Sequence, residues 1–286
     1  MISDITLGQY FPGFSPLHKL DPRTKIILAI LFIVAVFLAN SPASFLVLTL
    51  ITVLLIAVSR ISFSVILKGI KPIVFILIFT SLINIFMTVG EGEPLISFWV
   101  VNIYIEGFIR AFFMAYRVTL LIIGTSMLLT YTTSPISLTD GIESLLKPLK
   151  FIGVPVHLFA MMMTIALRFI PTLVEETEKI MNAQKSRGAD FSSGGLIKRA
   201  KSLIPILIPL FVSSFKRADE LAIAMECRCY RGDVNRSKYK ELKYKAVDAV
   251  WFLIFLIFFS SIILLRILPY NFDVSHMIYK IIFYRI

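Results

Sequence analysis

Long apolar segments occupy most of this chain, and they constrain its fold more than any other feature. They lie at about residues 26–39, 44–58, 72–89, 104–129 and 247–268. A membrane-spanning helix needs about 20 apolar residues, and the last two segments reach that length. The sequence therefore predicts an all-α fold: a polytopic membrane protein with about five transmembrane helices and a large polar insert before the last of them.

The composition excludes a soluble globular enzyme. Hydrophobic residues make up 57% of the 286 residues and charged residues only 16%, whereas a soluble chain carries about 25% charged residues. The apolar segments follow neither a heptad nor a glycine period, so a coiled coil and a collagen are excluded as well. The lipid bilayer is therefore the first partner that the sequence implies.

The chain is basic, with 29 Lys and Arg against 18 Asp and Glu, and its net charge is +11. Residues 179–245 alone carry 15 of the basic residues and six acidic ones. In membrane proteins Lys and Arg collect in cytoplasmic loops, which accounts for this excess without nucleic acid as a partner. The same rule places the N-terminus, the 60–71 loop and the insert after Thr130 in the cytoplasm.

A turn signal separates the first two apolar segments. Asn40-Ser41-Pro42 interrupts the apolar run, and these residue types favour turns. The alternative, one long kinked helix, would be too long for a single span. We therefore expect two helices joined by a tight turn.

Two arginines lie inside the fourth apolar segment. Arg110 and Arg117 are seven residues apart, so they share one helix face. A charge at mid-membrane costs about 3 kcal/mol on insertion scales. Arg110 fits a position near the outer interface. For Arg117 two interpretations stay open: a structural or partner contact, and a place on a substrate or proton path.

The insert contains two long segments with the same order of residue types. Residues 154–189 and 203–230 each begin apolar and end charged. Gly188 suits the C-terminal end of the first helix, and Gly232 is expected to close the second. Their apolar parts are short and broken by proline, so we expect two long helices and no span here. Acidic residues of the first segment are expected on a solvated face: Glu175, Glu176 and Glu178.

Each of these helices ends in an arginine with small neighbours, Arg187 in the first and Arg228 in the second, 41 positions apart. Arg presents a planar fork that binds carboxylates bidentately. Two such ends suit docking onto two copies of a partner, and two ordinary C-terminal caps are the alternative. The other candidate residues of this docking site are Ser186, Gly188, Glu226, Cys227 and Cys229.

The sequence contains no motif for a catalytic, nucleotide or metal site. The phosphate-binding pattern G-x-x-x-x-G-K-[ST] is absent, as are H-E-x-x-H and G-x-S-x-G. Cys227 and Cys229, one residue apart and without a nearby His, do not fit a zinc site. We expect no catalytic residue, no cofactor and no metal in this chain. An intramembrane enzyme that uses His18, Asp21, His157 or Glu175 is the alternative from another class.

Five segments match one known family in both order and residue types. Residues 181–191 read Met-Asn-Ala-Gln-Lys-Ser-Arg-Gly-Ala-Asp-Phe, and residues 224–232 read Ala-Met-Glu-Cys-Arg-Cys-Tyr-Arg-Gly. These resemble the two Ala-Arg-Gly signatures of EcfT, the CbiQ-like transmembrane component of energy-coupling factor (ECF) transporters. Residues 15–25 resemble its N-terminal motif, and residues 166–171 and 217–221 also fit. Ser186 and Cys227 stand where that family usually has alanine, and both are small.

The resemblance implies a non-catalytic coupling subunit of an ATP-driven vitamin importer in the prokaryotic cell membrane. Its implied partners are two ABC-type ATPase subunits, which bind ATP and Mg, and a small substrate-binding membrane subunit, the S subunit. Arg187 and Arg228 are then the residues that dock onto the ATPases by pairing with acidic side chains. A dedicated coupling subunit for one substrate (cobalt, nickel or a single vitamin) is the alternative.

The expected domains follow from the segments and the resemblance together. Residues 1–130 are expected to form the N-terminal transmembrane helices. Residues 131–246 are expected to form a cytosolic coupling domain of long crossed helices. Residues 247–286 are expected to form a final transmembrane helix and a tail.

Overall fold

The computed structural model describes residues 10–88, 96–98, 101–189, 191, 195–232 and 242–267. The chain divides into two compact units. We call Tyr10–Ser134 with Leu242–Ile286 the membrane unit, and Pro135–Glu241 with Met1–Gln9 the arm unit. The expected domain boundaries after residues 130 and 246 stay a prediction, and the tail after Ile267 lies outside the described residues.

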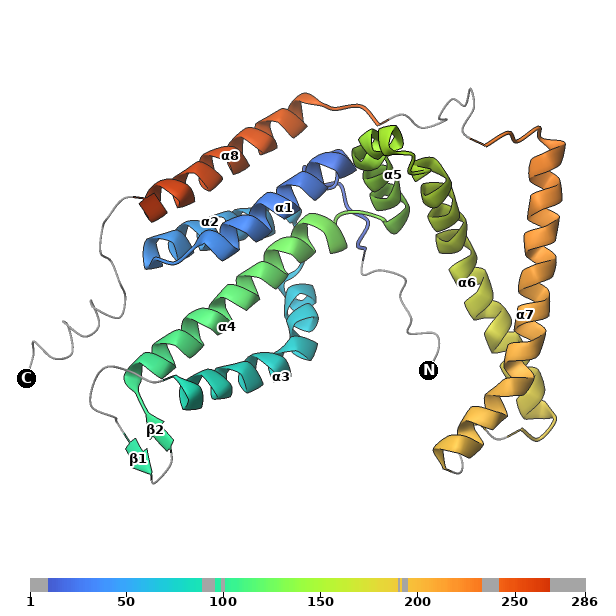
Figure 1. Ribbon diagram of the computed structural model, residues 1–286, viewed down its shortest axis with the longest axis horizontal. Coiled ribbons are helices and arrows are strands. Elements are labelled where there is room, and N and C mark those ends of the chain that lie inside the picture. Colours follow the sequence, from blue (N-terminus) through green and yellow to red (C-terminus); the bar gives the residue numbers. More distant parts are fainter. Residues whose placement is uncertain are drawn as a thin grey trace, which may run out of the picture. The chain divides into compact units, whose positions relative to one another are not determined.

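The described part of the membrane unit consists of five α-helices, one π-helical turn and one short hairpin (Figure 1). The helices are α1 (Pro22–Leu38), α2 (Pro42–Ser59), α3 (Phe63–Met87), α4 (Ile105–Thr125) and α8 (Ala246–Ile267), and the π-helical turn η1 (Ser126–Thr130) continues α4. Strands β1 (Ile96–Phe98) and β2 (Val101–Ile103) form an antiparallel hairpin between α3 and α4. The fold is therefore all-α apart from this hairpin.

The turn between α1 and α2 has the chemistry that its sequence predicts. The Ser41 hydroxyl accepts a hydrogen bond from the Ser44 N–H at 3.2 Å and so caps α2, whose first residue is Pro42. Proline suits this first position because its nitrogen has no hydrogen to leave unsatisfied. The expectation of two helices instead of one kinked helix is confirmed.

Arg117 makes a structural contact at this same turn. Its guanidinium, on α4, donates to the Ala39 carbonyl oxygen at 2.6 Å and to Asn40 Oδ1 at 3.4 Å. It also lies over the Phe45 ring, 5.5 Å from the centroid. Ala39 is the C-cap residue of α1, where a cation interacts favourably with the free carbonyl groups. The geometry favours the structural interpretation of Arg117.

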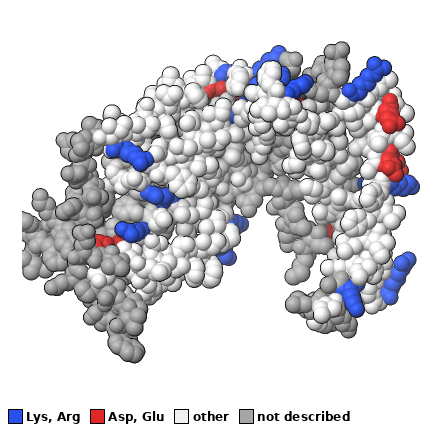
Figure 2. All heavy atoms as spheres, viewed as in Figure 1, with Lys and Arg blue, Asp and Glu red and all other residues white. Residues whose placement is uncertain are grey.

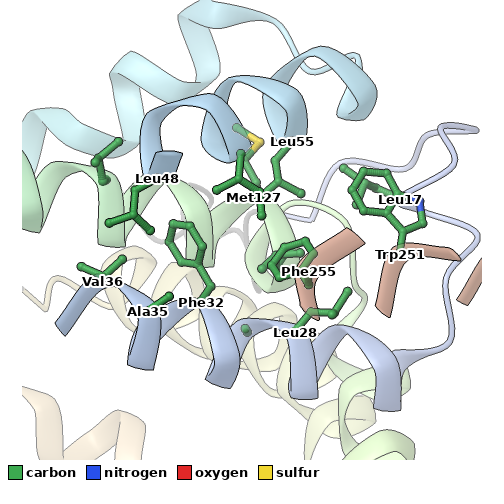
Figure 3. Packing of buried hydrophobic residues seen from close by; sticks show 14 of the residues in the cluster. Leu17, Leu28, Phe32, Ala35, Val36, Leu48, Leu55, Met127, Trp251 and Phe255 are labelled. Carbon is green, nitrogen blue, oxygen red and sulfur yellow. The ribbon is translucent and has the colours of Figure 1, made fainter. Parts of the chain in front are cut away.

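The core of the membrane unit lies where α1, α2, α4, η1 and α8 meet (Figure 3). Phe32 on α1 is 1% exposed, and the backbone of Gly124 on α4 lies directly against its ring. A Cβ atom at Gly124 would lie 2.1 Å from Phe32 Cε1, so only glycine permits this approach. Other buried members of the core are Leu28, Val36, Leu48, Leu55, Met127 and Phe255.

Helix α3 begins earlier than the sequence predicts. Residues 63–71, expected in a basic loop, form its first turns, and Pro72 lies inside the helix. Proline removes one backbone hydrogen bond there and restricts the residue before it, which is why the sequence favours a boundary at this position. The expectation of a loop over residues 63–71 is wrong.

The arm unit contains α5 (Pro135–Leu146), the 3₁₀ helix η2 (Lys147–Ile152), and two long helices, α6 (Val156–Ser186) and α7 (Leu196–Cys227). His157 Nδ1 and Glu143 Oε1, 3.0 Å apart, join α6 to α5. Helices α6 and α7 contact each other, and Figure 1 shows them crossing. The expected pair of long crossed helices is confirmed, although α7 starts at Leu196 and runs through Pro205 and Pro209.

Five helices of the described chain are long and apolar enough to cross a membrane. They are Pro42–Ser59, Phe63–Met87, Ile105–Thr130, Val156–Ser186 and Ala246–Ile267. The number agrees with the expected five, but the set differs: α1 has only 17 residues, and α6 qualifies through its apolar first half. By length and composition α6 is a candidate span that the sequence analysis did not expect, and the prediction that the insert contains no span stays a prediction. On the face in Figure 2, most of the described surface is neither acidic nor basic.

Candidate functional site

The C-terminal end of α6 forms a hydrogen-bonded turn around Arg187. Arg187 is the C-cap residue, and its N–H donates to the Gln184 carbonyl at 3.1 Å. Gly188 follows at φ +86° and donates to the Lys185 carbonyl at 2.9 Å. The Ala189 N–H then reaches back to the Gln184 carbonyl at 3.0 Å. A left-handed residue with these two backward bonds is the Schellman motif, which satisfies carbonyls at a helix end.

The C-terminal end of α7 repeats this turn bond for bond. The Arg228 N–H donates to the Met225 carbonyl at 3.1 Å. Cys229, at φ +56°, donates to the Glu226 carbonyl at 2.8 Å. The Tyr230 N–H donates to the Met225 carbonyl at 3.1 Å. Arg187 and Arg228 therefore occupy the same position in two matching helix ends.

The residue that ends α7 differs from the one that the sequence predicts. Gly188 ends α6 as expected, but Gly232 does not end α7. Cys229 takes the left-handed position three residues earlier, and Cys227 is the last helical residue. A left-handed conformation costs a non-glycine residue roughly 1–2 kcal/mol, which is why the residue types favour Gly232 over Cys229 as the end of the helix.

The candidate docking residues of the two ends are all exposed. Ser186, Arg187, Gly188, Glu226, Cys227, Arg228 and Cys229 lie on the surface of the arm unit. The Ser186 hydroxyl donates back to the Asn182 carbonyl of its own helix at 3.1 Å. Both cysteines are free thiols. Among the described residues neither signature arginine forms an ion pair, so each guanidinium is open to a partner.

A cross-helix ion pair joins α6 to α7 upstream of these ends. Arg217 Nη2 of α7 donates to Glu176 Oε2 of α6, and the two side chains are 33% and 27% exposed. Glu176 therefore does not lie on a fully solvated face, and that expectation is wrong for this residue. Glu176 and Arg217 are 41 positions apart, the same offset as Arg187 and Arg228. Only the tertiary structure reveals this pair, because opposite charges on two long helices allow many pairings in the sequence.

The arrangement suits binding more than catalysis. The described residues contain no group of three His, Cys, Asp or Glu that could hold a metal ion. What the two ends offer is an exposed guanidinium each, held by a rigid helix terminus and flanked by small side chains. Such a group forms two parallel hydrogen bonds with a carboxylate, so the geometry fits acidic grooves on a partner.

Comparison with known proteins identifies the family. The family model described as "Cobalt transport protein" (CbiQ) matches residues 13–239. The chain is similar to the protein from Clostridium kluyveri named "Energy-coupling factor transporter transmembrane protein EcfT", with 56% identity over 93% of this chain and 98% of the relative. A protein of the same name from Bacillus subtilis is 48% identical over 87% of this chain and 93% of its own length.

Proposed function

Since the chain belongs to the CbiQ family and is the transmembrane component of an energy-coupling factor transporter, we propose that α6 and α7 couple two ATPase subunits to a substrate-binding subunit. In this proposal the arm unit lies in the cytoplasm, and the chain itself catalyses nothing. ATP and Mg are bound by the ATPase partners. The S subunit carries the vitamin.

The observation that carries this proposal is that the C-terminal ends of α6 and α7 have the same backbone geometry. Each presents an exposed arginine at the C-cap and an adjoining left-handed residue, with the same three backbone hydrogen bonds. A pair of equal ends suits two equal or homologous partners, one for each end. One bidentate Arg–carboxylate contact at each end would then fix the ATPases to the arm unit.

The ion pair between Glu176 and Arg217 supports a mechanical link between the two ends. It fastens the helices to each other eleven positions before Arg187 and Arg228, respectively. Movement of one docked end by an ATPase is then passed to the other helix at this crossing. Packed helices transmit such movements as small rigid shears.

Exposed apolar side chains on α6 and α7 support the proposed contact with the S subunit. Phe159 and Met163 on α6 are 55% exposed, and Phe211 on α7 is 61% exposed. Exposed apolar side chains of this kind mark a contact with a protein partner or with the membrane. These side chains suit a hydrophobic S subunit at the membrane surface.

The test is purification of the native complex in mild detergent, with mass spectrometry of the proteins that accompany this chain. The proposal predicts two ATPase subunits and a small hydrophobic subunit. Several different small subunits would identify a shared coupling component, and a single one, for cobalt, nickel or one vitamin, would identify a dedicated component. Recovery of the chain without any ATPase after gentle cross-linking would contradict the proposal.

A further inference from the structure

The chain leaves the membrane unit after Ser134 and returns to it at Leu242. These two places are the covalent junctions that flank the inserted chain from Pro135 to Glu241. Both junctions contact one short segment at the start of α1, residues 21–25. That segment lies in the N-terminal motif, but the docking function described above gives it no role.

Lys25 holds the first junction. Its side chain is 2% exposed, and its Nζ donates to the Thr132 carbonyl at 2.7 Å and to Thr133 Oγ1 at 3.2 Å. These threonines lie two and one residues before Ser134, the last residue before the arm unit. A buried ammonium group thus binds the chain directly after η1.

Arg23 holds the second junction. Its Nη2 donates to the Leu242 carbonyl at 3.4 Å, and its guanidinium lies 5.3 Å from the centroid of the Tyr244 ring. Leu242 is the first residue of the membrane unit after the chain returns. Arg23 and Lys25 therefore bind opposite ends of the same inserted chain.

Asp248 joins this segment to the start of α8. Its side chain is 3% exposed, and its two oxygens accept from the Asp21 N–H at 2.8 Å and the Lys245 N–H at 2.7 Å. One carboxylate thus satisfies a backbone donor at the start of α1 and another at the start of α8. Asp21 in turn caps α1 by accepting from the Arg23 N–H at 2.9 Å.

Stability alone does not require buried charges at this place. Replacement of a buried ion pair by well-packed apolar residues is often neutral or stabilising. Here the charged groups instead form hydrogen bonds with backbone atoms at both junctions. Such hydrogen bonds are directional, whereas packing of apolar side chains would not fix the direction of the backbone. We propose that Asp21, Arg23, Lys25 and Asp248 form a junction clamp that makes the two junctions rigid, so that arm movements are transmitted into α4 and α8.

The clamp rests on the proposed function for its role in transport, since it acts on movement that the ATPases supply. Its residues are positioning residues, and they contact neither the ATPases nor the substrate in this proposal. Loss of the clamp should therefore leave assembly and ATP hydrolysis intact while it uncouples them from uptake.

The test uses the complete complex in proteoliposomes with the variants Arg23→Met and Lys25→Met, and with Lys19→Met as the matched control on an exposed lysine of the same N-terminal motif. Arg23→Met leaves the buried lysine in place and guards against a variant that fails to fold. We expect the clamp variants to retain the ATPases and their hydrolysis rate while uptake per ATP falls about tenfold, within the usual range of coupling energies. Unchanged uptake per ATP in both variants, or a parallel fall of assembly, hydrolysis and uptake, would overturn the proposal.

A second readout does not depend on the ATPases. Hydrogen exchange is measured on the purified wild-type chain and on two variants. In the Asp248→Ala chain the amides of Asp21 and Lys245 are compared with wild type. In the Arg23→Met chain the amides from Leu242 to Lys245 are compared with wild type. Faster exchange at these amides, with exchange in α2 unchanged, is expected. Unchanged exchange would refute the clamp even if the docking function holds. Faster exchange in a chain that binds no ATPase would support the clamp as a structural device and contradict the docking function alone.

Discussion

Glu176 on α6 and Arg217 on α7 form an ion pair, and each lies eleven positions before the arginine that ends its own helix. Eleven helical residues rise about 16 Å, so the crossing and the two helix ends form a lever with nearly equal arms. The same 41-residue offset relates the paired residues and the terminal arginines. The two helices therefore have the same spacing from the crossing to the terminal arginine.

The Glu176–Arg217 pair should show measurable coupling between its members. A double-mutant cycle with Glu176→Gln and Arg217→Met, followed by the free energy of unfolding of the purified chain, should give a coupling of about 1 kcal/mol, the upper end for partly exposed pairs. Glu175→Gln, a change at the exposed neighbour, is the control and should have no coupling to Arg217. A coupling of zero for Glu176 would show that the pair does not fasten the crossing.

Cys229 should respond to glycine in the opposite way from Cys227. Cys229 is left-handed, so Cys229→Gly removes strain and should stabilise the end of α7 by about 1 kcal/mol. Cys227 is helical, so Cys227→Gly should destabilise the same end by about 1 kcal/mol. Hydrogen exchange at the Cys229 and Tyr230 amides, which close the turn, measures both. Equal effects of the two substitutions would contradict the left-handed assignment.

Gly188 offers the reciprocal test in α6. Gly188→Ala places a Cβ on a left-handed residue and should speed amide exchange at Gly188 and Ala189, at a cost of roughly 1–2 kcal/mol. No neighbouring atom lies within 4 Å of that Cβ, so the effect is conformational and not steric. Unchanged exchange would mean that the α6 end does not need the glycine.

Gly124 should tolerate no side chain while Phe32 keeps its size. Gly124→Ala brings a methyl group into the Phe32 ring, and overpacking of this kind costs about 1–3 kcal/mol. The midpoint of thermal unfolding in detergent should fall, and the addition of Phe32→Leu should recover part of the loss. If Gly124→Ala leaves the midpoint unchanged, α1 and α4 are not as closely packed as the structure has them.

Local signals predicted the features that depend on neighbouring residues. Segment length predicted four of the five candidate spans, Ser41-Pro42 predicted the start of α2, and Gly188 predicted the end of α6. Each follows from hydrogen-bonding or conformational rules that act within a few positions. The long helices and their terminal arginines could be placed for the same reason.

The features that the sequence did not predict depend on contacts between distant residues, or on tertiary packing that offsets an unfavourable local conformation. Asp21 and Asp248 meet although 227 positions separate them, and no local pattern reports such a contact. Cys229 adopts a conformation that its residue type disfavours, and Pro72 lies inside a helix that proline normally ends. In these cases the surrounding structure overrides the local preference.

If the two terminal arginines hold the ATPases, recovery of ATPase subunits with the Arg187→Ala/Arg228→Ala double variant reveals it. Arg231→Ala, at an exposed arginine just beyond the second end, is the matched control. Truncation of one partner of a desolvated charge pair costs about 2–5 kcal/mol, at least thirtyfold in affinity for each arginine. The account predicts that the double variant inserts normally, loses the ATPases and takes up no substrate, whereas the Arg231 variant behaves as wild type. Wild-type recovery of the ATPases with the double variant would contradict the account.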